Sequence, residues 1–147
     1  MYGYGGILLR INLSTGKIDK EDMDMQDILD FVGGRGFGIK YLYQEVPAYA
    51  DPLGPQNKLI LATGVLAGTS ALTASRWVAC TKSPLTGCYA RASAGGDFGA
   101  WMKFAGYDFF LIEGAADKPV YVHVTRDGVQ IEDAGEKLVK FASIVTG

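Results

Sequence analysis

The sequence has 147 residues, of which 48% are hydrophobic and 20% charged, a composition typical of one folded domain and not of a disordered segment. The formal net charge of −2 leaves no basic excess for nucleic acid, so we expect no nucleic-acid partner. The longest apolar runs, 59–62 and 109–112, have the length of strands and not of membrane spans. The first residues lack the regions of a signal peptide, and we therefore expect a cytoplasmic protein that is not bound to a membrane.

In the first part of the chain, the sequence predicts a strand pair, two short helices and a loop. The predicted elements are strands at 7–13 and 17–20, helices at 27–32 and 36–46, and a loop at 51–57. The first helix should stop at Gly33-Gly34, because glycine commonly follows the end of a helix.

The rest of the chain predicts mostly strands. The predicted elements are strands at 58–63, 77–82, 88–93, 108–113, 120–125 and 129–132, and a helix at 98–105. Asp97 is the expected N-cap of that helix. The elements do not alternate regularly, which indicates an α+β fold with about seven to nine strands and three short helices.

The segment 64–75 consists mostly of small residues and is followed by Arg76. Gly64 and Gly68 lack a Cβ, so the backbone there can approach a ligand closely. The Arg76 guanidinium has the fork-shaped set of donors that matches a phosphate. We interpret this segment as a platform for a large phosphorylated cofactor. A set of tight turns in a sheet protein explains the same residues equally well.

Two glycine-rich segments do not fit nucleotide-binding motifs. In 33–38 the third glycine comes one residue early, and a helix precedes it where a strand is required. We expect a tight helix–helix corner there, with Arg35 as an anion contact. The segment 64–69 lacks the lysine and the spacing of a P-loop.

The sequence offers no convincing set of catalytic side chains. His123 is the only histidine and is expected on the wetter face of a strand. Cys80 and Cys88 are expected to be reduced and buried, and together with one histidine they are too few for a closed zinc site or a four-cysteine cluster. We therefore predict binding and no catalytic residue.

The best candidate for anion binding is the glycine pair Gly95-Gly96, which precedes the predicted helix at 98–105. Free backbone N–H groups and the helix dipole favour an anion at such a position. Arg76 would add a positive charge if the fold brings it alongside. Trp77 would either stack on a heterocycle or pack against the sheet.

A set of motifs occurs in a fixed order within residues 1–134. In chain order they are Arg10-Ile11-Asn12-Leu13-Ser14-Thr15-Gly16, Gly34-Arg35-Gly36, Asp51-Pro52-Leu53, Asn57-Lys58-Leu59-Ile60, Gly68-Thr69-Ser70-Ala71, Arg76, Thr81-Lys82-Ser83-Pro84-Leu85-Thr86-Gly87, Gly95-Gly96 with Phe98-Gly99-Ala100, and Lys103-Phe104-Ala105-Gly106-Tyr107-Asp108. Each motif is weak by itself, but the ordered set is specific. With it, the chain resembles the N-terminal domain of the tungsten-containing aldehyde ferredoxin oxidoreductases.

The resemblance implies a domain of two β-sheets that forms the base for a tungsten or molybdenum bis-pyranopterin cofactor. Arg76 would contact a pterin phosphate, and the backbone at Ser93 and Gly95 would help to hold the phosphates and a bridging Mg²⁺. The expected cofactor-binding residues are Arg76, Ser93, Ala94, Gly95 and Gly96, with Ser93 as the Mg²⁺ ligand. Family members carry Asn at the Ser93 position, a mild change if the main-chain carbonyl makes the contact.

The reaction implied by the resemblance is oxidation of an aldehyde with water to a carboxylic acid. Two electrons would pass through a [4Fe–4S] cluster to ferredoxin. The cluster cysteines and the acid/base residues of the family belong to later domains, so we expect an inactive cofactor-binding portion of a longer enzyme. Aldehyde and ferredoxin would be partners of that whole enzyme.

Two alternatives stay open: a stand-alone pterin-binding or assembly module, and a fragment of a related aromatic-ring reductase of the benzoyl-CoA type. Residues 1–134 should form the tungstopterin-binding domain. Residues 135–147 resemble a displaced continuation of it, so an intervening segment is expected to be missing. Exposed strand edges and apolar faces favour self-association into a homo-oligomer.

Overall fold

The computed structural model of the chain describes residues 3–135, which form eight strands and three helices. The strands are β1 (Ile7–Asn12), β2 (Lys17–Asp22), β3 (Lys58–Thr63), β4 (Trp77–Lys82), β5 (Tyr89–Ala94), β6 (Phe109–Glu113), β7 (Val120–Val124) and β8 (Val129–Asp133), and the helices are α1 (Met25–Phe31), α2 (Arg35–Glu45) and α3 (Phe98–Phe104). The predicted α+β class with short helices is confirmed. Residues 136–147, nearly all of the expected displaced continuation, lie outside the described residues.

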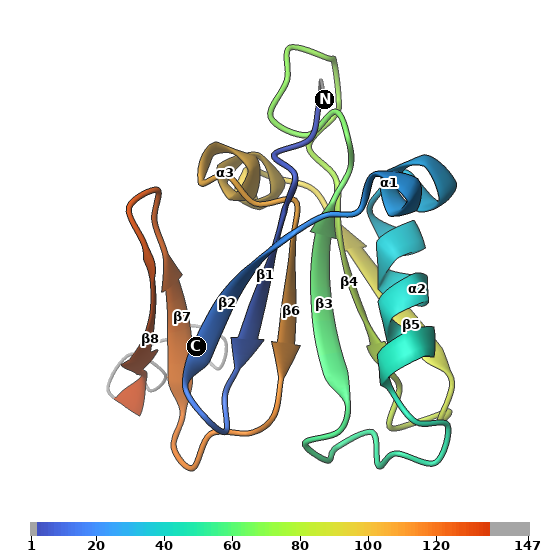
Figure 1. The fold of residues 1–147 in the computed structure, drawn as a ribbon, viewed down its shortest axis with the longest axis vertical. Coiled ribbons are helices and arrows are strands. Elements are labelled where there is room, and N and C mark those ends of the chain that lie inside the picture. The colour runs from blue at the N-terminus through green and yellow to red at the C-terminus, as the bar shows by residue number, and fades with distance from the viewer. Residues whose placement is uncertain (1–2, 136–147) are drawn as a thin grey trace, which may run out of the picture.

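Six strands form one sheet in the order β2-β1-β6-β3-β4-β5, and β7 and β8 form a separate two-stranded ribbon. β1 and β6 are parallel, and all other neighbouring strands are antiparallel. Figure 1 shows the six-stranded sheet between the ribbon on one side and α1 and α2 on the other. The two expected sheets are therefore present, and β2 and β5 are the edges of the larger one.

Both faces of the sheet are buried, because the central strands carry apolar residues at consecutive positions, and successive side chains point to opposite faces. The core on the helix side is formed by Leu8, Ile28, Phe37, Leu42, Ile60, Ala62, Val78, Cys80, Phe109 and Leu111. The core on the other side contains Leu9, Ile11, Met102, Tyr107 and Phe110, covered by apolar residues of the ribbon. Successive residues of β1 and β6 thus enter different cores, which fixes the register of these strands.

The corner between α1 and α2 is as tight as the glycines predicted. A Cβ on Gly36 would overlap the carbonyl of Phe31 and lie 3.3 Å from its Cα, so only glycine fits. The end of α1 differs from the prediction, since Val32 and not the glycine pair caps it. Val32 adopts φ 61°, and Gly33 N donates to Phe31 O at 2.6 Å to close a γ-turn. A positive φ strains a β-branched residue, and sequence patterns do not reveal such a site.

Five charged residues form a network between α2 and the sheet. Arg10 donates to Glu21 at 2.6 Å and to Glu45 at 2.8 Å, and Lys58 pairs with Glu45 at 3.2 Å and with Glu113. Burial opposes ionisation of Glu45 and Glu113. Hydrogen bonds and charge attraction from Arg10 and Lys58 outweigh this, and they lower the pKa of both carboxyls. The network ties β1, β2, α2, β3 and β6 together.

The small-residue segment forms a loop between β3 and β4 that rises beyond the end of the sheet, light green at the top of Figure 1. Gly68 has φ 75°, and a Cβ there would lie 3.3 Å from the ring of Phe104. Glycine therefore lets this loop lie against α3. Within the described residues, no helix is long and apolar enough to span a membrane.

Candidate cofactor-binding site

Arg76 and Gly95 lie side by side at one end of the sheet. In the antiparallel register of β4 and β5, Trp77 is opposite Ala94, so the preceding residue of β4 faces the residue that follows β5. Gly64 N donates to Arg76 O at 3.3 Å, so the pairing with β3 also continues as far as Arg76. The structure thus brings together the two parts of the predicted site.

The Arg76 side chain is exposed and available to a ligand. Within residues 3–135, no carboxylate lies within 4.0 Å of its guanidinium. It borders a shallow depression together with Gly64, Val65, Ala67 and neighbouring loop residues. An exposed guanidinium without an internal partner can bind an anion at little cost.

Ser93 and Ala94 end the edge strand β5, and both are exposed. No described strand pairs with the outer side of β5, so its outward backbone groups are open to a ligand or another chain. The Ser93 hydroxyl accepts a hydrogen bond from Arg91 Nη1 at 3.1 Å. Arg91 is not among the binding residues that the sequence predicted. The period-2 alternation of a strand, which places residues 91 and 93 on one face, is the signal that could have found it.

Gly95 and Gly96 are explained by different physical reasons. Gly96 has φ 78°, a backbone conformation that favours glycine. Gly95 has no positive φ, and a Cβ built on it would meet nothing within 4 Å. Gly99 contrasts with it, because its Cβ would lie 3.3 Å from Ser75 O and 3.4 Å from Trp77 Cβ. Internal packing therefore explains Gly99 but not Gly95.

The helix α3 begins at Phe98, as predicted. Asp97 occupies the N-cap position, but its side chain makes no capping hydrogen bond, because its backbone is already helical at φ −88° and ψ −13°. An N-cap side chain reaches the first turn from an extended backbone. Trp77 packs against Phe98 with 4.7 Å between ring centroids, and its Nε1 donates to Gly95 O at 3.2 Å. The Trp77 indole thus contacts both Phe98 of α3 and the backbone of Gly95.

Other reactive side chains lie apart from this site. His123 is exposed on the ribbon, as predicted, and its Nδ1 lies 3.1 Å from Glu132 Oε1, a partner that sequence order did not suggest. Both cysteines are free thiols; Cys80 is buried, but the expected burial of Cys88 is wrong, because Cys88 is exposed. In the described part of the chain, no three His, Cys, Asp or Glu side chains are placed to hold a metal ion.

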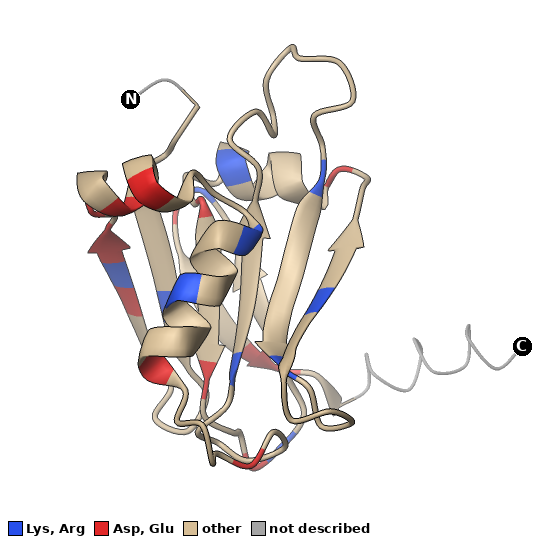
Figure 2. Cartoon of the chain, turned by 90° about the vertical axis from the view of Figure 1, so that its right-hand side faces the viewer, with Lys and Arg blue, Asp and Glu red and all other residues tan. Residues whose placement is uncertain are grey.

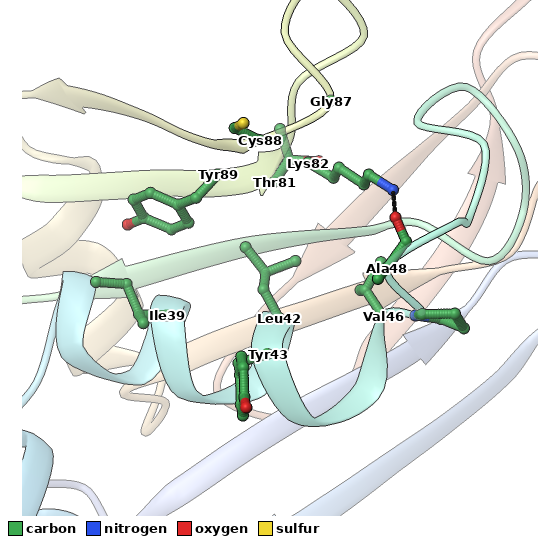
Figure 3. Close-up of a pocket in the computed structure, with 11 residues that line it drawn as sticks. Ile39, Leu42, Tyr43, Val46, Ala48, Thr81, Lys82, Gly87, Cys88 and Tyr89 are labelled. Atoms are coloured by element: carbon green, nitrogen blue, oxygen red, sulfur yellow. Dashed lines mark hydrogen bonds between the residues drawn. The ribbon is translucent and has the colours of Figure 1, made fainter.

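A second concavity lies between α2 and the β4–β5 hairpin (Figure 3). Its lining is mostly apolar, with Leu42 and Tyr89 among the residues shown. Lys82 reaches across one end, and its Nζ donates to Ala48 O at 2.6 Å and to Ala50 O at 2.8 Å. Because that ammonium group is already engaged, the groove offers less to a phosphate than the surface around Arg76.

The family model of the aldehyde ferredoxin oxidoreductase N-terminal domain matches residues 8–146. The chain belongs to this family. It is 48% identical over 143 residues to the tungsten-containing aldehyde ferredoxin oxidoreductase of Pyrococcus horikoshii, an alignment that covers 97% of this chain and 24% of the relative. The family resemblance found in the sequence motifs is therefore confirmed.

More distant relatives also match. The aliphatic sulfonate oxidoreductase, WOR-like subunit, of Pyrococcus furiosus is 34% identical over 137 residues, which cover 91% of this chain and 22% of that protein. The solved active site complex BamBC of benzoyl coenzyme A reductase, in complex with 1,5-dienoyl-CoA, has a TM-score of 0.92 and 33% identity. That match covers 98% of this chain and 23% of the solved one. The chain thus spans about a quarter of the length of these relatives.

Proposed function

We propose that this chain is the cofactor-binding N-terminal portion of a tungsten or molybdenum bis-pyranopterin oxidoreductase. The whole enzyme would oxidise an aldehyde with water to a carboxylic acid and pass two electrons to ferredoxin. One observation carries the proposal: the register of β4 and β5 sets Arg76 opposite Gly95. Among the described residues the Arg76 guanidinium has no carboxylate partner, and neither a contact nor a positive φ requires glycine at position 95.

The residues present fit a large phosphorylated group. The site has an exposed cation in Arg76, exposed backbone at Ser93 and Ala94, and no side chain at Gly95 and Gly96 to keep a ligand away from the main chain. The helix α3 has only seven residues, so its dipole contributes little, and the proposal does not depend on it.

In this proposal each residue of the chain has a binding role. Arg76 would hold a pterin phosphate through the N–H donors of its guanidinium. The main-chain carbonyl of Ser93 supplies a hard oxygen ligand for Mg²⁺, which suits that cation. Gly95 and Gly96 let the cofactor approach the backbone closely. When bound, the metal pterin supplies the two-electron redox chemistry, and a [4Fe–4S] cluster would be held by parts of the enzyme outside this chain.

Metal and pterin analysis of the protein purified from cells that make the cofactor tests the proposal. We expect tungsten or molybdenum together with pterin in the wild-type protein, and a severalfold loss of both in Arg76→Ala, at an unchanged melting temperature. Protein that is well folded but free of metal and pterin would instead support the alternative of an assembly module. The 147-residue chain alone should give no aldehyde-dependent dye reduction.

A second candidate, a portion of a benzoyl-CoA type reductase, draws support from the structural match to BamBC. The higher identity to the tungsten-containing aldehyde enzymes, 48% against 33%, favours aldehyde oxidation. Assays of the whole enzyme with an aldehyde and with a cyclic dienoyl-CoA would separate the two. We also propose a cytoplasmic location and a homo-oligomer, which fractionation and light scattering would test.

A further inference from the structure

The β4–β5 side of the molecule carries positive charge that the chain does not neutralise. The sequence has no acidic residue between Asp51 and Asp97. In Figure 2, β4 and β5 carry basic positions and no acidic ones, whereas β2 and α1 carry several acidic positions. The two lysines of this stretch have partners, since Lys58 pairs with carboxylates and Lys82 with backbone carbonyls. The charge that remains belongs to arginines.

Arg91 directs its guanidinium toward the site that contains Arg76. Residues directly opposite one another share a face of the sheet, and Arg91 lies opposite Cys80, whose side chain is in the core below α2. The hydrogen bond from Arg91 Nη1 to the Ser93 hydroxyl, at 3.1 Å, shows that the side chain extends along β5 toward its end. Arg76 approaches the same stretch from the start of β4.

Arg35, the first residue of α2, lies at the same end of the sheet as Arg76. Gly34 N donates to Thr63 O at 3.0 Å, next to Gly64, which pairs with Arg76. A Cβ on Gly38, in the first turn of α2, would lie 3.8 Å from the Tyr89 hydroxyl. Burial and the hydrogen bond with Cys80 raise the pKa of Tyr89, and the charges of Arg91 and then Arg35 oppose that rise, so both guanidinium groups act on one phenol.

Arg35, Arg76 and Arg91, here called the arginine surface, are all exposed. Among the described residues, none of the three has a carboxylate within 4.0 Å. Three like charges near each other repel unless an anion lies between them. A ligand with two phosphoryl groups provides both the charge and the acceptor geometry that guanidinium groups match bidentately.

We propose that Arg91 and Arg35 are further phosphate-binding residues, which together with Arg76 hold a ligand with two phosphoryl groups on the α2 side of the β4–β5 edge. This inference rests on the proposed function, because it takes the phosphoryl groups to be those of the cofactor. Ser93 holds the Arg91 side chain in the direction that this role requires.

Titration of the 147-residue chain with inorganic pyrophosphate tests the inference. Calorimetry gives the affinity, and amide chemical shifts in NMR spectra locate the bound anion. The variants are Arg35→Gln, Arg76→Gln and Arg91→Gln, which remove one charge each. The matched control is Arg126→Gln, which removes the same charge from an exposed position in the turn between β7 and β8.

If the inference is right, each of the three variants binds pyrophosphate roughly threefold to tenfold more weakly, while Arg126→Gln binds as the wild type does. The amides of 33–36 and 93–96 should shift together on binding. Arg91→Lys keeps the charge and should retain more affinity than Arg91→Gln, which separates lost binding from lost folding. Thermal unfolding of every variant provides the same check.

Two results would overturn the inference. If only Arg76→Gln loses affinity, Arg35 and Arg91 are not ligands, although the proposed cofactor site around Arg76 stands. If the wild-type chain does not bind pyrophosphate, the arginine surface is not a phosphate site. The proposed function is then judged separately, by the metal and pterin content of the purified protein.

Discussion

Gly38 of α2 lies directly against Cys80 of β4. A Cβ built on Gly38 would stand 2.8 Å from the Cβ of Cys80 and overlap its sulfur. This contact sets how closely α2 approaches the sheet, and α2 carries Arg35 at its first position. The glycine thus positions one residue of the arginine surface as well as the core.

Gly38→Ala should therefore destabilise the chain by about 1–3 kcal/mol, because α2 or β4 must move to admit a methyl group. Urea unfolding monitored by circular dichroism measures the change. An unaltered free energy of unfolding would mean that the helix can shift away from the sheet without penalty.

Gly95→Ala, in contrast to Gly38→Ala, should not destabilise the chain. A Cβ there meets nothing within the described chain, and the backbone does not need a positive φ. We expect equal stability or a gain of up to about 1 kcal/mol, since alanine restricts the unfolded chain. Retention of tungsten or molybdenum and pterin should fall severalfold. Full retention in this variant would remove the steric reason proposed for the glycine.

Arg10→Leu tests the charge network below α2. It removes the ion pair of Glu21 and, among the described residues, leaves Lys58 as the only cation paired with Glu45 and Glu113, so we expect a loss of about 1–3 kcal/mol. The control is Lys17→Ala, whose ion pair with Asp19 is exposed and should contribute less than about 1 kcal/mol. Similar losses in the two variants would contradict a special role for the network.

The same network predicts a loss of stability in acid. The pKa values of Glu45 and Glu113 are lowered in the folded chain from the ordinary value of 4.5. Their contribution is therefore complete above pH 4.5 and is lost as the pH falls through the lowered values. Unfolding measured from pH 7 down to pH 3 should show this decline. Arg10→Leu should flatten it, and an equally steep decline in that variant would assign the effect to other carboxyls.

The two thiols should differ in reactivity. Cys80 is buried beneath α2, and this burial raises the pKa of its thiol, whereas Cys88 is exposed. A thiol reagent such as Ellman's should modify only one thiol per native chain, and both after unfolding. Cys88→Ser should abolish the native reaction, and fast modification of that variant would show that the core beneath α2 opens readily.

Local chemistry made most of the elements predictable. Period-2 and helical patterns located all eight described strands and all three described helices to within about two residues at each end. The differences concern detail at the helix ends: Val32 caps α1 with a positive φ, and the side chain of the N-cap residue Asp97 makes no capping hydrogen bond. Both depend on the path that the neighbouring chain imposes on the backbone, which residue types alone do not specify.

Residue types and their short-range order were enough to predict the family, the strand and helix content and the glycine-rich segments on which a phosphorylated cofactor could lie. Only the tertiary structure placed Arg76 beside Gly95, brought Arg91 and Arg35 to the same side, and joined Arg10 to Glu45 and Glu113. The physical reason is that sheet register and the packing of α2 on β4 bring residues far apart in the chain into contact. Whether a charge is paired or free depends on those contacts.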